Sequence, residues 1–228
     1  MTVRTVLERG PRERKFVAYA PDWPGWSRGA KTAADAISTL ASYRDRYRPI
    51  AVAAGLGDEF DGAGDLEMIE DRVGTGSTDY WGISFSPASF EVGGMSTAEL
   101  ERKLALLQAC WTYFDQVVAR VSPELRKGPR GGGRDRDEIM NHTLGCERIQ
   151  FAVKVGVRTP EGVQATAEGR RAHREAYTAA IRDYAAEGKK ARTWELAFLL
   201  RHTAFHLLDH AWEMEDRDLS GLAPSGND

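Results

Sequence analysis

The sequence predicts an α+β N-terminal module over residues 1–95, followed by an all-α up-down four-helix bundle over residues 96–228. Two observations predict this division. Before residue 95, short runs of β-branched and aromatic residues alternate with turn residues, which is typical of strands. From Ser96 onward, apolar residues recur every three or four positions in four long segments, which is typical of amphipathic helices in a bundle.

The first half is expected to contain a hairpin, one helix and two further strands. The runs Arg4 to Glu8 and Lys15 to Ala20 flank a Gly-Pro turn and predict the β-hairpin. Apolar residues at helical spacing predict a helix over residues 32–47. Short apolar runs predict strands over residues 50–54 and 66–73, with a loop between them over the glycine-rich and acidic residues 55–64.

Each of the four helices in the second half has a start signal. Serine or aspartate followed three residues later by glutamate forms a capping box, in which both side chains bond free N–H groups. Proline in the first turn and threonine at the N-cap mark helix starts as well. The signals, in order, are Ser96 with Glu99, Asp135 with Glu138, Thr159-Pro160, and Thr193.

Composition excludes several classes of protein. The chain has 228 residues, a net charge of −3 and a pI near 6.0, so binding of nucleic acid through bulk positive charge is not expected. No run of about 18 apolar residues predicts a membrane span, and the first residues do not resemble a signal peptide. Two cysteines, Cys110 and Cys146, cannot form a disulfide framework. We therefore expect a cytoplasmic protein that acts on a small molecule, with no nucleic-acid or membrane partner, as a monomer or a homodimer.

Histidines supply the strongest chemical signal. Three of the five in the chain, His202, His206 and His210, lie four residues apart in the last predicted helix. Four residues correspond to about 400° of rotation and about 6 Å of rise, so neighbouring members of this series share a face of the helix. Two histidines at this spacing can chelate one metal ion. The spacing alone leaves both pairs open, His206 with His210 and His202 with His206.

A third ligand is expected from another helix. His142 lies along an apolar stripe of the second predicted helix, which makes it the candidate partner of His206 and His210. Three imidazoles leave a coordination position open for water or substrate, as in reactive metal sites. The competing interpretation is that the histidines are structural and bond carbonyl and carboxylate groups. His173 lies in an arginine-rich stretch and is expected at the surface.

Other side chains are weaker candidates. Cys146 lies one turn beyond His142 and is expected to pack rather than to bind the metal. Glu147 is expected either to accept a hydrogen bond from a histidine ring or to pair with Arg148 or Arg120 at the surface. Three tryptophans are expected to line a cleft between the two halves of the chain: Trp23, Trp26 and Trp81.

The histidine-bearing segments resemble the DinB-like superfamily. The run Arg201 to Arg217 resembles the last bundle helix of that family, and Asp137 to Glu147 resembles its second helix. The resemblance implies a four-helix bundle over roughly residues 96–218 and a divalent-metal site on His142, His206 and His210. It also implies the activity of a thiol-dependent transferase or isomerase that uses mycothiol, bacillithiol or glutathione. The metal would be Zn, Ni or Fe.

The first half resembles the HicB antitoxin N-terminal domain in a shorter stretch. The resemblance rests on Phe16 to Trp26, on Gly29 and on the helix predicted from Thr32 to Leu40, with Trp26 in place of the usual cysteine. It implies a small α/β unit that packs against a partner. The second hypothesis for the whole chain is accordingly a non-catalytic binding or assembly protein, in which this module recruits a partner and the histidines are structural.

Overall fold

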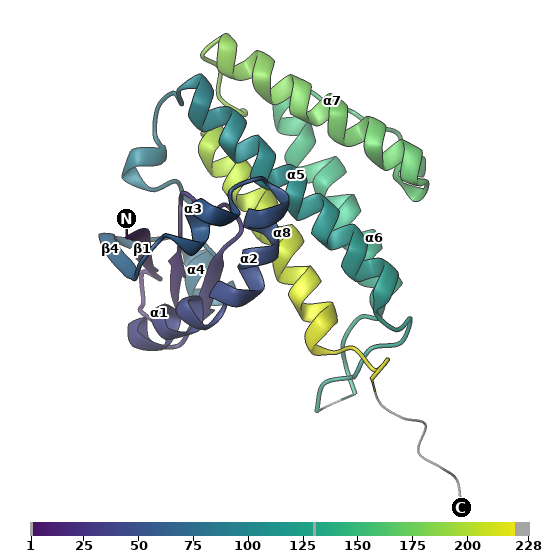
Figure 1. The fold of residues 1–228 in the computed structure, drawn as a ribbon, viewed down its shortest axis with the longest axis horizontal. Coiled ribbons are helices and arrows are strands. Elements are labelled where there is room, and N and C mark those ends of the chain that lie inside the picture. Colours follow the sequence, from purple (N-terminus) through teal and green to yellow (C-terminus); the bar gives the residue numbers. More distant parts are fainter. Residues whose placement is uncertain (1, 130, 222–228) are drawn as a thin grey trace, which may run out of the picture.

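The computed structural model describes residues 2–129 and 131–221. It shows a mixed α+β protein, in which a small sheet and its short helices pack against one side of a group of long helices (Figure 1). The mixed class predicted from the sequence is confirmed. None of the helices in the described residues has the length and apolar character needed to cross a bilayer.

Four strands form one sheet in the order β3-β2-β1-β4. β1 (Val3–Arg9) and β2 (Phe16–Tyr19) form an antiparallel hairpin, and β3 (Ser27–Ala30) continues the sheet antiparallel to β2. β4 (Leu66–Val73) pairs parallel with β1 and leaves its other side at the sheet edge. The predicted hairpin and the predicted strand over residues 66–73 are therefore confirmed.

Two consecutive helices cover the stretch between β3 and the next turn. α1 (Ala33–Ser42) and α2 (Arg44–Ala53) divide the helix predicted over residues 32–47. The strand predicted over residues 50–54 is wrong, because most of this segment belongs to α2. Tyr47 and Ile50 are buried three residues apart on the inner face of α2, and this helical spacing outweighs the local preference of the sequence for a strand.

An aromatic cluster holds the short helices to the sheet. The stretch 55–64, predicted as a loop, contains the short helix α3 (Gly57–Asp61), because Phe60 inserts into this cluster. The Phe60 ring lies 4.8 Å from that of Trp23 and 5.4 Å from that of Trp26. Trp26 stacks on Tyr47 with ring centroids 5.6 Å apart. Burial of these large rings is the main reason that the segment is ordered.

Two further short elements connect β4 to the long helices. α4 (Gly76–Trp81) follows the sheet, and the 3-10 turn η1 (Ser89–Glu91) precedes the first long helix. Between them, Ser84 and Ser86 donate hydrogen bonds to the fully buried carboxylate of Glu8 on β1. This connection fixes the loop over residues 82–88 against the sheet.

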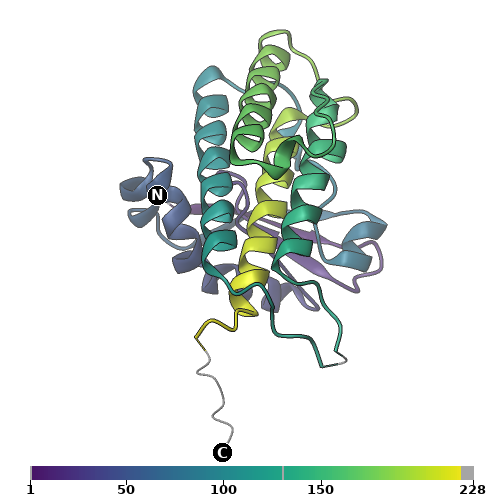
Figure 2. The ribbon, with the colours of Figure 1, turned by 90° about the vertical axis from the view of Figure 1, so that its right-hand side faces the viewer.

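Among the described residues, the second half of the chain contains four helices of more than ten residues, which Figure 2 shows in front of the sheet. The capping boxes predicted at Ser96 and Asp135 are confirmed at the starts of the first two. The third begins after Thr166 and the fourth after Glu195, later in both cases than predicted. The helices are α5 (Thr97–Arg120), α6 (Arg136–Cys146), α7 (Ala167–Ala186) and α8 (Leu196–Asp216).

The late starts of α7 and α8 have local causes. The 3-10 turn η4 (Val163–Ala165) separates Pro160 from α7. Before α8, Ala191 forms a backbone bridge with Trp194, and Arg192 between them has a positive φ of 58°. The two backbone hydrogen bonds between Ala191 and Trp194 place residues 191–194 in a tight turn, so α8 begins only after Glu195.

α6 does not end at Cys146 but changes its winding. Residues Glu147–Phe151 form the π-helix η2, and Ala152–Val155 form the 3-10 helix η3, which stops at Gly156. A π-helical turn contains one more residue than an α-helical turn at the same place, and such turns occur frequently at functional sites.

The two halves share one buried core. The aromatic cluster around Trp26 is continuous with the apolar faces of α5 and α8. Arg201 of α8 forms a buried ion pair with Glu91 of η1 (2.7 Å) and lies over the Tyr19 ring. The predicted boundary between residues 95 and 96 therefore marks a change of secondary structure within a single packed core.

Candidate metal centre

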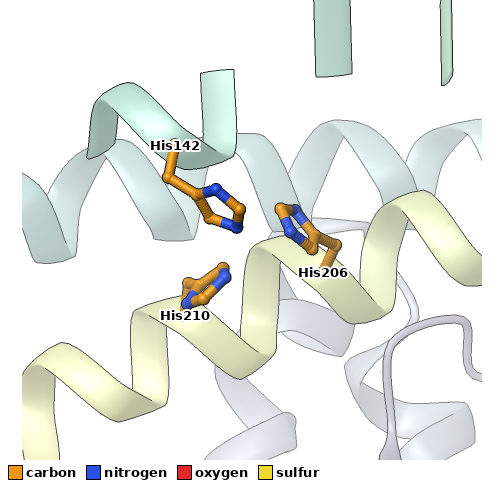
Figure 3. Close-up of side chains that lie close together, drawn as sticks. All are labelled: His142, His206 and His210. Carbon is orange, nitrogen blue, oxygen red and sulfur yellow. The ribbon is translucent and has the colours of Figure 1, made fainter. Parts of the chain in front are cut away.

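Three of the predicted residues converge between α6 and α8. His142 points from α6 toward His206 and His210, which lie one turn apart on α8 (Figure 3). The ring centroids are 5.2 Å apart for His142 and His206, 5.0 Å for His142 and His210, and 4.7 Å for His206 and His210. One ring nitrogen of each lies within 4.8 Å of the others.

This spacing fits a small metal ion. Nitrogens bound to a tetrahedral ion at about 2.0–2.1 Å lie about 3.4 Å apart, so the ring nitrogens, which lie within 4.8 Å of one another, need to approach by at most about 1.4 Å. Rotation about the side-chain bonds can supply this movement. All three side chains are half-buried, which leaves access for an ion and for a further ligand.

A carboxylate orients one of the rings. Nδ1 of His210 lies 2.9 Å from Oε2 of Glu213, which is three residues further along α8. Arg217 holds the same carboxylate from its other side, with Nη1 donating to Oε1 at 2.7 Å. When Nδ1 carries the proton and donates it to Glu213, Nε2 of His210 presents its lone pair, as in many carboxylate–histidine–metal arrangements.

The electrostatic environment keeps the inner rings neutral. Burial is the main cause that lowers the pKa of His206 to about 2, with smaller contributions from His210 and His142. Burial also lowers the pKa of His142, followed by the effect of Arg134. Because only a neutral imidazole can bind a metal ion, both rings are in the competent form at pH 7.

An apolar wall closes one side of the cluster. Phe151, at the end of the π-helix η2, lies 5.5 Å from the ring of His206 with its plane nearly perpendicular.

The buried Cys146 has its sulfur 3.8 Å from both ring nitrogens of His142 and accepts a hydrogen bond from Gln150. Cys146 is not part of the three-residue set, as its predicted packing role requires.

His202 stands apart from the cluster. Its ring is buried among aromatic side chains, with Phe85 at 4.9 Å, Trp194 at 5.3 Å and Phe151 at 5.6 Å. Burial is the main cause that lowers its pKa to about 3. The geometry therefore favours His206 with His210 over the alternative pair of His202 with His206.

Two residues lie elsewhere than the sequence predicted. Glu147 is fully buried, where it accepts hydrogen bonds from Trp111 and Gln164, so it neither orients a histidine of the cluster nor pairs at the surface. His173 is also buried, with Nδ1 2.7 Å from the hydroxyl of Thr159 and Nε2 3.5 Å from Glu147. The prediction that His173 is solvated is wrong.

The three tryptophans predicted to line a cleft divide among three environments. Trp23 lines a cavity of about 460 Å³ between the first half and α5, but the histidine cluster does not border this cavity. Its two arginines, Arg4 and Arg102, are already paired with Asp22 and Glu59. Trp81 lines a second cavity, of about 290 Å³, that reaches α8. Trp26 is buried in the core and lines neither.

The N-terminal half lies behind the cluster rather than over it. The sheet and its helices contact α8 on the side away from α6, as Figure 2 shows. Arg28 on β3 pairs with Asp209 at 2.8 Å, and Arg46 on α2 pairs with Glu215 at 2.8 Å. The half therefore holds α8 in position, and α6 with η2 forms the opposite wall of the site.

No family model, curated protein or solved structure matches the chain. The resemblances to the DinB-like and HicB families stay predictions. Since one fold can support many different activities, the chemistry of the site is the guide to the function of this chain.

Proposed function

We propose that the chain binds one divalent metal ion through His142, His206 and His210 and uses the remaining coordination position for chemistry on a small molecule. The observation that carries this proposal is the convergence of three ring nitrogens within 4.8 Å, two of them on neighbouring turns of α8. The pairing of His210 with Glu213 supports it, because it fixes the ring nitrogen that would bind the ion.

The donor set narrows the choice of metal. Three imidazoles without a carboxylate or thiolate suit Zn²⁺, Ni²⁺ and Fe²⁺ rather than Mg²⁺ or Ca²⁺, which prefer oxygen ligands. This set agrees with the DinB-like resemblance of residues 96–218, for which we retain the proposal of a four-helix bundle formed by α5 to α8.

The proposed reaction class is thiol transfer or isomerisation. A bound divalent ion would stabilise a low-molecular-weight thiol as its thiolate, the nucleophilic form. The residues of the chain would orient and shield this thiol: Glu213 holds His210 in place, and Phe151 excludes water from one side. Mycothiol, bacillithiol and glutathione are the thiols that the resemblance implies.

Elemental analysis tests the metal proposal directly. Protein purified without a histidine tag should contain about one equivalent of a divalent metal, as expected for a three-histidine site. His206→Ala should lose most of it. His202→Phe is the matched control, since it removes a histidine from the same helix and places an aromatic ring among aromatic neighbours. Equal metal contents in the two variants would contradict the assignment.

Cobalt substitution tests the thiol step. Addition of glutathione to the Co²⁺-loaded protein should produce a thiolate-to-cobalt charge-transfer band in the near ultraviolet. The His206→Ala variant should show no such band. An unchanged spectrum of the loaded wild-type protein, with each of the three thiols added in turn, would contradict thiol chemistry while leaving the metal site intact.

The second candidate, a non-catalytic assembly protein, is supported by the free edge of the sheet. β4 is an edge strand and exposes Met68, Ile69 and Val73. Exposed apolar edge strands can pair with another chain. A homodimer built on this edge should dissociate in the Ile69→Lys variant, as measured by sedimentation velocity, and a monomeric wild-type protein would rule it out.

A further inference from the structure

A positively charged cavity lies on the face of α8 that the sheet covers, and none of the three clustered histidines lines it. It has a volume of about 290 Å³ and lies between strand β3, the residues that follow α4, and one face of α8. Phe205 and Asp209, which line it, directly precede His206 and His210 in the sequence. The residues that give the cavity its character are Lys15, Arg28, Lys31, Trp81, Phe205 and Asp209.

The charges in this cavity do not cancel. Asp209 is the one carboxylate among the lining residues, and Arg28 already pairs with it at 2.8 Å. In the part of the chain that the structure describes, the lysines within 4.0 Å of a carboxylate are Lys127, Lys189 and Lys190, so Lys15 and Lys31 have no such partner there. Two positive charges are therefore left without a negative partner, in a chain whose net charge is −3. Such a local excess attracts anions.

Aromatic rings and a backbone carbonyl group hold two of the positive side chains, Arg28 and Lys15, in place. The guanidinium of Arg28 lies 3.8 Å from the ring centroid of Tyr43 and 4.3 Å from that of Trp212, so it is clamped between two aromatic side chains. Nζ of Lys15 donates a hydrogen bond to the carbonyl oxygen of Tyr80 at 2.6 Å. Lys31 remains exposed at the rim and free to contact a ligand.

A solvent-exposed aromatic side chain lines the same cavity as these cations. Trp81 is 62% exposed, which is unusual for the largest apolar side chain. The backbone around it is tightly placed, because a Cβ on Gly29 would lie 2.3 Å from the carbonyl oxygen of Gly82. The backbone next to Trp81 is thus held against β3, and the exposed indole offers a surface on which a planar ring can stack.

We propose that this cavity binds a small anion that carries a planar ring, with the anionic group at Lys31 and Lys15 and the ring against Trp81. The cavity and the histidine cluster lie on different faces of α8, so anion binding by the cavity does not rest on the proposed function. The cavity of about 460 Å³ is not expected to bind an anion in the same way, because acidic side chains outnumber basic ones along its walls.

A pair of fluorescent probes tests the recognition of charge and ring together. 8-Anilino-1-naphthalenesulfonate carries both features, and N-phenyl-1-naphthylamine has the same rings without the sulfonate. Metal-free wild-type protein should bind the sulfonate at one site and more tightly than the neutral amine. Lys31→Glu should weaken sulfonate binding about tenfold, the size of one charge-assisted hydrogen bond, and leave binding of the amine unchanged.

Further variants separate this site from general apolar binding. Lys31→Arg should restore the affinity for the sulfonate, and Trp81→Ala should weaken binding of both probes. Lys189→Glu is the matched control, because Lys189 is an exposed lysine outside the cavity. The proposal is overturned if Lys31→Glu and Lys189→Glu bind the sulfonate equally, or if the sulfonate and the neutral amine have the same affinity for the wild-type protein.

Binding in the cavity should not depend on the histidine cluster, because none of the lining residues is a histidine. His206→Ala should therefore bind the sulfonate as tightly as metal-free wild-type protein does. A large loss of sulfonate affinity in this variant would contradict binding in the cavity, whereas its metal content tests the proposed function separately.

Discussion

The carboxylate of Glu213 should control how tightly the histidine cluster holds a metal ion. It accepts a hydrogen bond from Nδ1 of His210 at 2.9 Å, and this bond is the first cause that lowers the pKa of Glu213. Loss of such a partner weakens metal binding about 10- to 100-fold in general. The Glu213 side chain is 37% exposed, so water can replace part of its role. We therefore expect Glu213→Gln to weaken Zn²⁺ binding about tenfold, at the lower end of that range.

Competition with a chromophoric chelator at pH 7 measures this change. Arg217→Met is the control, because it breaks the ion pair of 2.7 Å with Glu213 and leaves the contact to His210 in place. Zn²⁺ affinity in Arg217→Met should stay within about threefold of the wild type, since Glu213 still accepts the hydrogen bond from His210 and a partly exposed ion pair contributes about 1 kcal/mol or less. Equal losses in the two variants, or no loss in Glu213→Gln, would refute the argument that the carboxylate acts by orienting the ring.

Two further predictions concern the docking of the first half of the chain on α8. Glu91→Gln should lower the free energy of unfolding by about 3 kcal/mol in urea titrations, because it leaves Arg201 charged and buried without its partner. Joint replacement of Glu91 by Met and Arg201 by Leu should recover most of that loss, and a double variant as unstable as the single one would contradict the explanation. His202 has a folded-state pKa near 3, below its ordinary value of 6.5, so the unfolded chain binds more protons between these values and stability falls as the pH falls. Relative to His202→Phe, the metal-free wild type should lose up to about 1.4 kcal/mol per pH unit across this window, and parallel stability profiles of the two proteins would show that the ring is not excluded from water.

Helical spacing predicted that two histidines of α8 share a face, because the period of an α-helix fixes which residues do so. It left two pairs open, and only the packing of α6 against α8 selects His206 with His210. The same rule could have found Glu213, three residues after His210, but the sequence alone does not tell which of several acidic residues near the end of α8 turns toward the ring. His173 was misjudged from its arginine neighbours. It lies four residues before Tyr177 and eight before Ile181, which are both buried, so the apolar spacing of α7 indicated an inward position.

The positively charged cavity could not be predicted from the sequence. Lys15 precedes β2, Lys31 follows β3, and Trp81 ends α4, so their proximity depends on the sheet order and on the docking of α4. Asp209 of α8 also lines the cavity, and it lies 181 residues after its partner Arg28 in the chain. Such contacts are long-range, and short-range patterns carry no information about them. The strand expected over residues 50–54 failed for a related reason, since burial of Ile50 against the aromatic cluster decided its conformation.

The π-helix η2 behaves like a one-residue insertion between His142 and Phe151. In a continuous α-helix each residue turns by about 100°, so removal of one residue would rotate everything after it by that angle relative to His142. Ile149, exposed on the outer side of this turn, is the residue whose deletion disturbs the core least. A continuous α-helix without this extra residue would direct the Phe151 position away from His206. The position of the Phe151 ring beside His206 thus depends on the number of residues in this one turn. A comparison of homologous sequences should therefore find the ring gained or lost through insertion or deletion of a single residue rather than through substitutions.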